Sequence, residues 1–211
     1  MATPPTSSPP KTRQALIVLF LAFLGLAAQG PGDLPVHADT ARDRVDAARD
    51  LSFEPARLRG AMGSGGTGVQ GGAWPLHIEG LRSLGVPFRG IRILSAFAAA
   101  LAVLAAFLGA GCVWGTGGAW FAAVIAALAI GLPPYAFRVQ WNPTLLPLPS
   151  TIMALAVLGA ARKGHWIHYP AAALSLSLIN SMHISTYAAA APIAVALVIF
   201  RPRRRPVAIL F

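Results

Sequence analysis

The sequence predicts an all-α, polytopic integral membrane protein with about six transmembrane helices and a long external first loop carrying short juxtamembrane helices. Two observations predict this class. Hydrophobic residues make up 55% of the 211 residues and charged residues only 11%, whereas a soluble domain usually carries about 25% charge. The apolar residues also fall into long uncharged blocks with arginine and lysine at their ends, as expected for residues that orient membrane spans.

Charge and cysteine content narrow the possible functions. A net charge of +10 is typical of nucleic-acid-binding proteins, but the excess lies in short clusters beside apolar blocks and so favours membrane spans. Cys112 is the single cysteine, which rules out an intrachain disulfide and fits no zinc pattern. His165 and His168 have no acidic neighbour. We therefore expect no metal site, no cofactor and no nucleic-acid partner.

The N-terminal part predicts a tail and one span. Residues 1–14 are rich in Pro, Ser and Thr and predict a disordered cytoplasmic tail. Residues 15–28 form the first apolar block, which is short for a span. Because Lys11 and Arg13 precede it, a cleaved signal peptide is the alternative interpretation. Both interpretations place residue 33 outside the cytoplasm.

Residues 33–90 predict a long external loop that opens with an acidic helix. In HADTARDRVDAARD, residues 37–50, four aspartates share one helical face because their spacings are four, three and four. They are Asp39, Asp43, Asp46 and Asp50. A helix on the membrane surface, with its acids in solvent or in ion pairs, explains the last three. Asp39 precedes the first turn, where it is either an N-cap or a partly desolvated base; the residues alone favour the cap.

The same loop contains two further features. A literal G-x-G-x-x-G occurs at Gly63, Gly65 and Gly68. No strand is expected before it and no helix opens on it, so we interpret it as a flexible loop. WPLHIEGLRSLGVP, residues 74–87, predicts a short interfacial helix with Trp74 as its aromatic anchor.

Four further apolar blocks follow the external loop. They are residues 91–113, 119–135, 145–161 and 169–200. The last block is too long for one straight span of about twenty residues. Its polar interior, NSMHIST, predicts a tight helical hairpin with its turn near His183. Residues 15–200 then form one transmembrane domain.

The basic residues between and after the blocks predict the topology. Arg162 and Lys163 follow the fourth span, and residues 201–205 are mostly arginine. Both clusters lie in the cytoplasm with the N-terminus if the last block crosses twice. Segment 201–211 is then a basic cytoplasmic segment whose VAILF starts a possible further span. We therefore expect a fragment, or a natural truncation, of a longer membrane protein. We expect its location to be the bacterial inner (plasma) membrane.

Two polar residues outside the first loop are candidates for a site. Arg138, at the external end of the third span, is the only charge between Arg92 and Arg162. It is either an anchor that snorkels to the interface or a phosphate clamp. His183 is either a buried polar group with satisfied hydrogen bonds or a residue that faces an external cavity.

These segments, in this order, resemble a known family. The features are a span followed by an external Asp-x-x-Arg-Asp helix, a Gly-rich stretch leading to GGAWPLHIEGL, two spans paired around a short cytoplasmic turn, and RVQWNPTLLP. Together they resemble the N-terminal part of GT-C glycosyltransferases of family 39, the type of the dolichyl-phosphate-mannose protein mannosyltransferases and aminoarabinose transferases. The resemblance covers about residues 15–200. DT stands where many members have DE, and AWPL replaces the usual GPL.

The resemblance implies transfer of a sugar from a polyprenyl-phosphate donor to a lipid, glycan or protein acceptor on the external face. Asp39 would be the catalytic base that takes the acceptor's hydroxyl proton. Arg138 would stabilise the charge of the donor phosphate, and Arg42 and His183 would bind substrate from the cavity wall. The alternative is a non-catalytic polytopic membrane protein, either a transporter fragment or a degenerate relative with a scaffold role.

Overall fold

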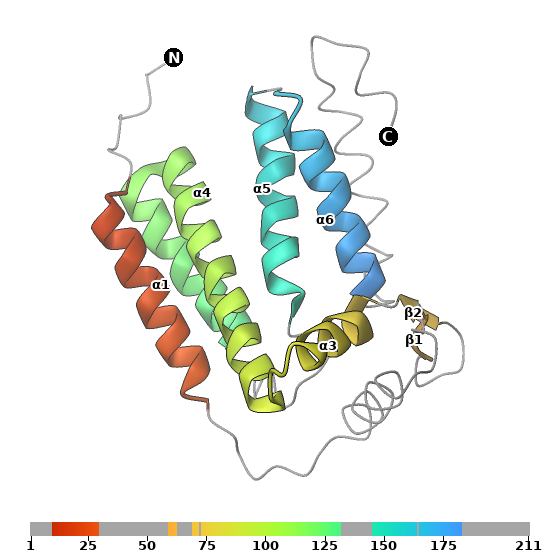
Figure 1. Ribbon diagram of the computed structural model, residues 1–211. Helices are drawn as coiled ribbons and strands as arrows, with labels where there is room; N and C mark the ends of the chain where they lie inside the picture. The colour runs from red at the N-terminus through yellow and green to blue at the C-terminus, as the bar shows by residue number, and fades with distance from the viewer. Residues whose placement is uncertain are drawn as a thin grey trace, which may run out of the picture.

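The computed structural model describes residues 10–29, 59–62, 69–71, 73–131, 145–163 and 165–182. Within these ranges the chain forms five helices and one short two-stranded sheet (Figure 1). The helices dominate the described part, in agreement with the expected class, and the apolar blocks account for most of them.

Helix α1, Thr12–Ala27, is formed by the first apolar block. At its start, Oε1 of Gln14 accepts a hydrogen bond from the backbone N–H of Lys11 at 2.9 Å, so a side chain from the first turn ties down the residue that precedes the helix. One side of α1 packs against α4, where Leu26 is buried. The opposite side exposes large apolar residues such as Phe20.

Helix α4, Phe88–Gly131, joins two of the expected spans into one element that doubles back. Gly115 has φ 69° and ψ −167°, a conformation that is almost restricted to glycine, and the chain reverses there. Phe107, before the reversal, lies in one buried cluster with Ala119 and Ala123, after it. The two halves of α4 are therefore antiparallel (Figure 1), which confirms the expected break between the second and third apolar blocks.

Helix α3, Ala73–Ser83, confirms the short helix expected in WPLHIEGLRSLGVP. It ends in a Schellman motif. The backbone N–H of Val86 donates to the Leu81 carbonyl at 3.0 Å, and the N–H of Gly85 donates back to the last turn at 2.9 Å. Gly85 has φ 79°, which glycine adopts without the steric cost of a Cβ.

Helices α5, Pro147–Lys163, and α6, His168–Met182, pack as a second antiparallel pair. They approach closely at Gly159, where an added Cβ would come within 2.5 Å of the His168 ring. Helix α5 is the expected fourth helical block. Helix α6 covers the first half of the last block, and the expected hairpin turn near His183 lies outside the described residues.

A strand precedes the Gly-rich stretch, and the expectation of none was wrong. Strands β1, Arg59–Met62, and β2, Val69–Gly71, pair antiparallel with an irregular register. Strands of three or four residues are too short to show a hydrophobic period in the sequence. A glycine-containing connection is also typical of a hairpin. The glycines between the strands, residues 63–68, lie outside the described part.

Apart from α3, which lies across one end, the helical segments run alternately between two ends of the molecule (Figure 1). We name one the turn end: it holds the start of α1, the reversal at Gly115 and the connection between α5 and α6. We name the other the α3 end: it holds α3, the end of α1, both termini of α4, the start of α5 and the end of α6.

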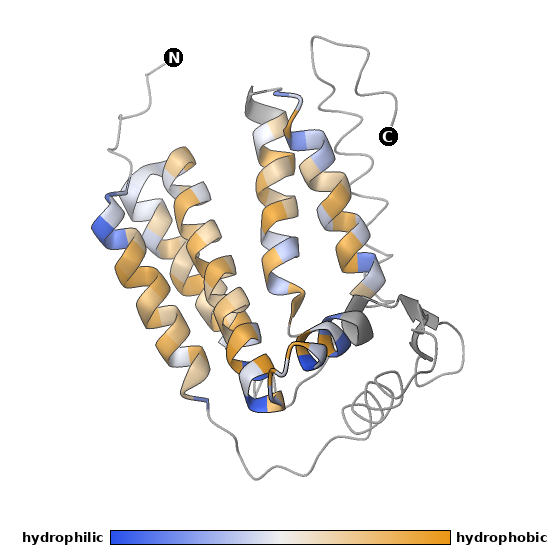
Figure 2. Ribbon diagram, viewed as in Figure 1, coloured by the Kyte–Doolittle hydropathy of each residue, from blue (hydrophilic) through white to orange (hydrophobic). Residues whose placement is uncertain are grey.

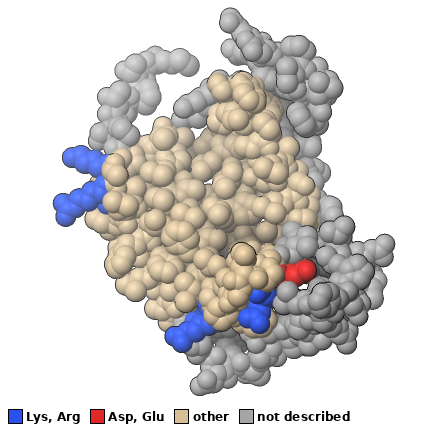
Figure 3. Space-filling model, viewed as in Figure 1, with Lys and Arg blue, Asp and Glu red and all other residues tan. Residues whose placement is uncertain are grey.

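The helices are apolar along their length (Figure 2), and the charged side chains that the structure describes lie at the two ends (Figure 3). Of the described helices, α4 is long and apolar enough to cross a membrane by length and composition. Helix α1 and the segment Pro147–Ala160 of α5 are shorter apolar helices. The number of about six spans stays a prediction.

Candidate functional site

The four residues expected to form a site, Asp39, Arg42, Arg138 and His183, lie outside the described residues. The structure does describe the helix ends from which their segments leave. Asp39 and Arg42 follow α1, Arg138 lies between α4 and α5, and His183 comes directly after α6. All of these helix ends lie at the α3 end (Figure 1).

A hydrogen bond joins the segments that lead to Asp39 and Arg138. Nε2 of Gln29, just after α1, donates to the carbonyl oxygen of Gly131, the last residue of α4, at 3.1 Å. The last carbonyls of an α-helix lack partners within the helix, so this bond both satisfies one of them and fixes the two exits side by side. Asp39 follows Gln29 by ten residues, and Arg138 follows Gly131 by seven.

An apolar cluster beneath α3 holds three other helix ends together, which are the starts of α4 and α5 and the end of α6. Its buried members are Ile78 of α3, Ile91 of α4, Leu145 before α5 and Met182 of α6. Burying a side chain of this size contributes about 1.5–3 kcal/mol, so α3 is bound firmly across three helix ends. Leu145 follows Arg138 by seven residues and Met182 immediately precedes His183, so the described residues from which both segments start lie in the cluster with α3.

Arg82 holds the connection between α3 and α4. Its Nη1 donates to the carbonyl oxygen of Val86 at 3.2 Å, and its guanidinium carbon lies 5.0 Å from the centre of the Phe88 ring. A guanidinium over an aromatic face is attracted by the ring quadrupole. Arg82 therefore stabilises the connection between α3 and α4, and its positive charge lies at the α3 end.

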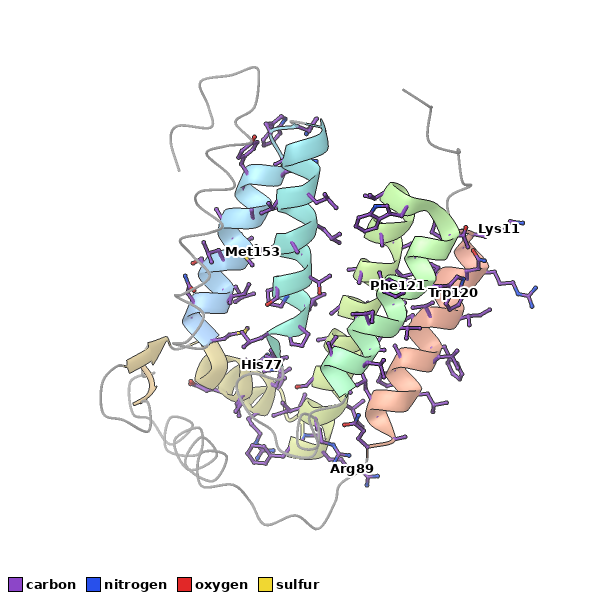
Figure 4. The ribbon with its side chains drawn as sticks, turned by 180° about the vertical axis from the view of Figure 1, so that it is seen from behind. Lys11, His77, Arg89, Trp120, Phe121 and Met153 are labelled. Carbon is purple, nitrogen blue, oxygen red and sulfur yellow. The ribbon has the colours of Figure 1, made fainter. Side chains whose placement is uncertain are left out.

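Arg89 and Arg92 form a basic pair that the sequence analysis left without a role. They lie one turn apart in the first turns of α4, and their guanidinium groups repel each other. Helix α4 has no acidic residue in its first turn, and Arg89 is exposed (Figure 4). Their spacing of three residues, at the start of a helix, is the sequence signal from which this pair could have been predicted.

His77 is a second residue that the sequence analysis left unassigned. It is half-buried on α3, at the end of the molecule where α5 starts and α6 ends (Figure 4). Burial lowers the pKa of its imidazole below the usual value, because poorly hydrated surroundings disfavour the charged form. A neutral imidazole has one nitrogen that donates and one that accepts a hydrogen bond. At pH 7 His77 therefore adds a polar group to this end without adding charge.

Two further tests bear on the site. The part of the chain that the structure describes contains no group of three or more His, Cys, Asp or Glu side chains that could hold a metal ion. No protein-family model, curated protein or solved structure matches the chain. The case for a function therefore depends on the chemistry of the residues and on their placement at the α3 end.

Proposed function

We propose that this chain is a glycosyltransferase of the bacterial inner (plasma) membrane, or the N-terminal part of one. It transfers a sugar from a polyprenyl-phosphate donor to a lipid, glycan or protein acceptor. The proposal includes about six spans with the N-terminus in the cytoplasm. The α3 end is then external, and the turn end is cytoplasmic.

The spacing of residues along α4 supports the membrane location. From Arg92 to Trp114 the helix rises by about 33 Å, close to the roughly 30 Å hydrocarbon core of a bilayer, and no charged residue lies between them. At the turn end, Trp114 is 64% exposed and Trp166 56% exposed. Tryptophan is favoured at the membrane–water interface, so the two residues mark one boundary of the bilayer and Arg92 marks the other.

One observation carries the enzymatic part of the proposal: the segments that contain all four expected site residues leave the helices at the α3 end. A catalytic base and a phosphate-binding side chain contribute to one transfer only if both can reach the reacting groups. The Gln29–Gly131 bond and the cluster that contains Leu145 and Met182 hold the exits near one another. This arrangement supports a shared external site.

The proposed residues have distinct roles in the transfer. Asp39 accepts the proton of the acceptor hydroxyl while the hydroxyl oxygen attacks the anomeric carbon of the sugar. The bond between that carbon and the donor phosphate oxygen breaks, and the polyprenyl phosphate leaves with the bonding electrons. Arg138 stabilises the charge that develops on the phosphate, while Arg42 and His183 bind substrate. Attack opposite to the leaving group inverts the anomeric configuration.

The test compares Asp39→Asn with Asp46→Asn in the protein that contains this chain, at matched membrane expression. Asparagine keeps the shape and most of the capping ability of aspartate, so a cap alone predicts near-normal activity. Loss of a catalytic base predicts at least a roughly hundredfold fall in transfer. Asp46→Asn is the control, because an exposed ion pair on a helix contributes only about 0.2–0.5 kcal/mol.

The measurement is transfer of radiolabelled mannose or aminoarabinose from the polyprenyl-phosphate sugar by isolated membranes. If the two variants behaved alike, or if Asp39→Asn stayed within a few-fold of the unaltered protein, Asp39 would be a helix cap. Absence of transfer from either donor by the unaltered protein would favour the non-catalytic alternative.

A further inference from the structure

One face of α4 changes from basic to apolar along its length. Arg89, Ile93 and Phe97 follow one another at intervals of four residues and therefore lie on the same side of the helix. All three are exposed, and Ile93 and Phe97 are 43% and 42% exposed. Arg92 lies one turn after Arg89 and adds a second guanidinium at the basic end.

Helix α1 forms the wall beside this face. The Phe23 ring of α1 meets the Phe97 ring edge to face, with ring centres 5.8 Å apart. One turn closer to the α3 end, Leu26 of α1 is buried in one cluster with Ala96 of α4. The apolar part of the face is therefore a seam between two helices, and it runs away from the arginines toward the middle of the molecule.

The basic end carries positive charge that the described side chains do not balance. Arg89 and Arg92 repel each other, and the first turn of α4 has no acid. The charge of Arg82 is held nearby by its contacts with the α3–α4 connection. Glu79 is the one acidic residue within the described ranges. An anion at this end would relieve the repulsion between the arginines.

We propose that the face formed by Arg89, Arg92, Ile93 and Phe97 binds an anionic phospholipid of the surrounding bilayer. The headgroup phosphate lies on the two arginines, and an acyl chain lies along the seam with α1. The positive charges of the two arginines attract an anionic phosphate, and the exposed apolar stripe matches a hydrocarbon chain. The inference rests on the membrane location proposed above.

The test measures how phosphatidylglycerol and phosphatidylcholine of the same chain length raise the unfolding temperature of the whole chain in detergent. We expect phosphatidylglycerol to bind more tightly, and this preference to shrink as salt screens the charges. The variant R89Q/R92Q lacks both arginines near the anionic headgroup. Its apparent affinity for phosphatidylglycerol should therefore be about thirtyfold weaker. K11Q/R13Q is the matched control, because it removes two exposed charges at the turn end.

A second variant covers the case in which R89Q/R92Q does not fold. R89K/R92K retains both charges and should keep most of the preference for phosphatidylglycerol. Equal stabilisation of the unaltered chain by both lipids would overturn the proposal. So would a lysine variant that behaves like the glutamine variant, or a control that loses as much affinity as R89Q/R92Q.

Two further experiments separate a wrong lipid site from a wrong membrane location. Polyprenyl phosphate is added as a competitor; if it displaced phosphatidylglycerol at far lower amounts, the face would belong to the donor lipid and the phospholipid proposal would be wrong. Alkaline carbonate extraction of membranes tests the location separately. A chain that resists extraction but does not distinguish the two lipids would overturn the lipid site alone.

Discussion

The turn end and the α3 end connect the same set of helices by different means. At the turn end the chain reverses at Gly115 within α4 and again in the short connection between α5 and α6. At the α3 end the chain leaves the helices for longer segments, and α3 packs across the helix ends through a buried apolar cluster. A tight turn leaves room for few side chains, whereas longer connections that start from neighbouring helix ends have room for several.

The difference indicates where chemistry is possible in this molecule. The turn end offers exposed tryptophans and a glycine turn, which suit a membrane boundary. The α3 end brings together a half-buried His77, a basic pair at the start of α4 and the exits toward Asp39, Arg138 and His183. The following predictions test this contrast, from the largest expected effect to the smallest.

The largest effect is the accessibility of the two ends in intact cells. Ser83→Cys, at the end of α3, should react with a membrane-impermeant maleimide, and His165→Cys, at the turn end, should react only after permeabilisation. Both positions are exposed, so a difference reports the side of the membrane. Cys112 is also exposed and is first replaced by serine. Labelling of position 165 before position 83 would reverse the proposed orientation.

The packing of the α4 hairpin gives the next effect. Phe107 is fully buried and its ring centre lies 5.2 Å from that of Trp120 on the returning half. Phe107→Ala should therefore lower the free energy of unfolding by about 3 kcal/mol, through lost contacts and a cavity. Phe121→Ala is the control, because Phe121 is 71% exposed and its loss should cost about 0.5 kcal/mol or less. Equal shifts in detergent unfolding curves would contradict the antiparallel packing.

The reversal at Gly115 gives a smaller effect. Its φ of 69° and ψ of −167° lie where any residue with a Cβ is strained, so Gly115→Ala should cost about 2 kcal/mol. Gly117→Ala is matched in chemistry, and an added Cβ there meets nothing within 4 Å. Alanine inside a helix is favoured over glycine by about 1 kcal/mol, so that variant should be as stable as the unaltered chain or more so. Thermal unfolding of both variants decides between strain and simple loss of glycine.

The smallest effect concerns pH and the α3 end. Burial lowers the pKa of His77 in the folded chain, so the unfolded chain binds a proton more readily. The stability that the neutral form contributes is present above the unfolded pKa of about 6.5 and is lost as the pH falls through the folded pKa. His77→Gln should therefore reduce the loss of stability between neutral and acidic pH. An unchanged loss of stability in His77→Gln would contradict this effect of burial.

Much of the helical fold could be predicted from the sequence because each helix has a local cause. Long uncharged apolar blocks predict α1, α4 and α5, since uninterrupted apolar segments of this length are typical of helices. The break in α4 was visible as a glycine-rich gap between two blocks. The antiparallel pair of β1 and β2 was not predicted, because such short strands show no hydrophobic period in the sequence. Strands of this length form only when paired.

The sequence by itself determined which residues can do chemistry and which segments are apolar. Only the tertiary structure decided which segments meet. Leu145 and Met182 are far apart in the chain yet lie in one cluster with α3, and Gln29 bonds to Gly131 across 102 residues. The seam between Phe23 and Phe97 beside the arginines likewise depends on how α1 packs against α4. Periodicity shows the face of one helix, but contacts between helices depend on shape, on the turn at Gly85 and on the reversal at Gly115, so they exist only in the folded chain.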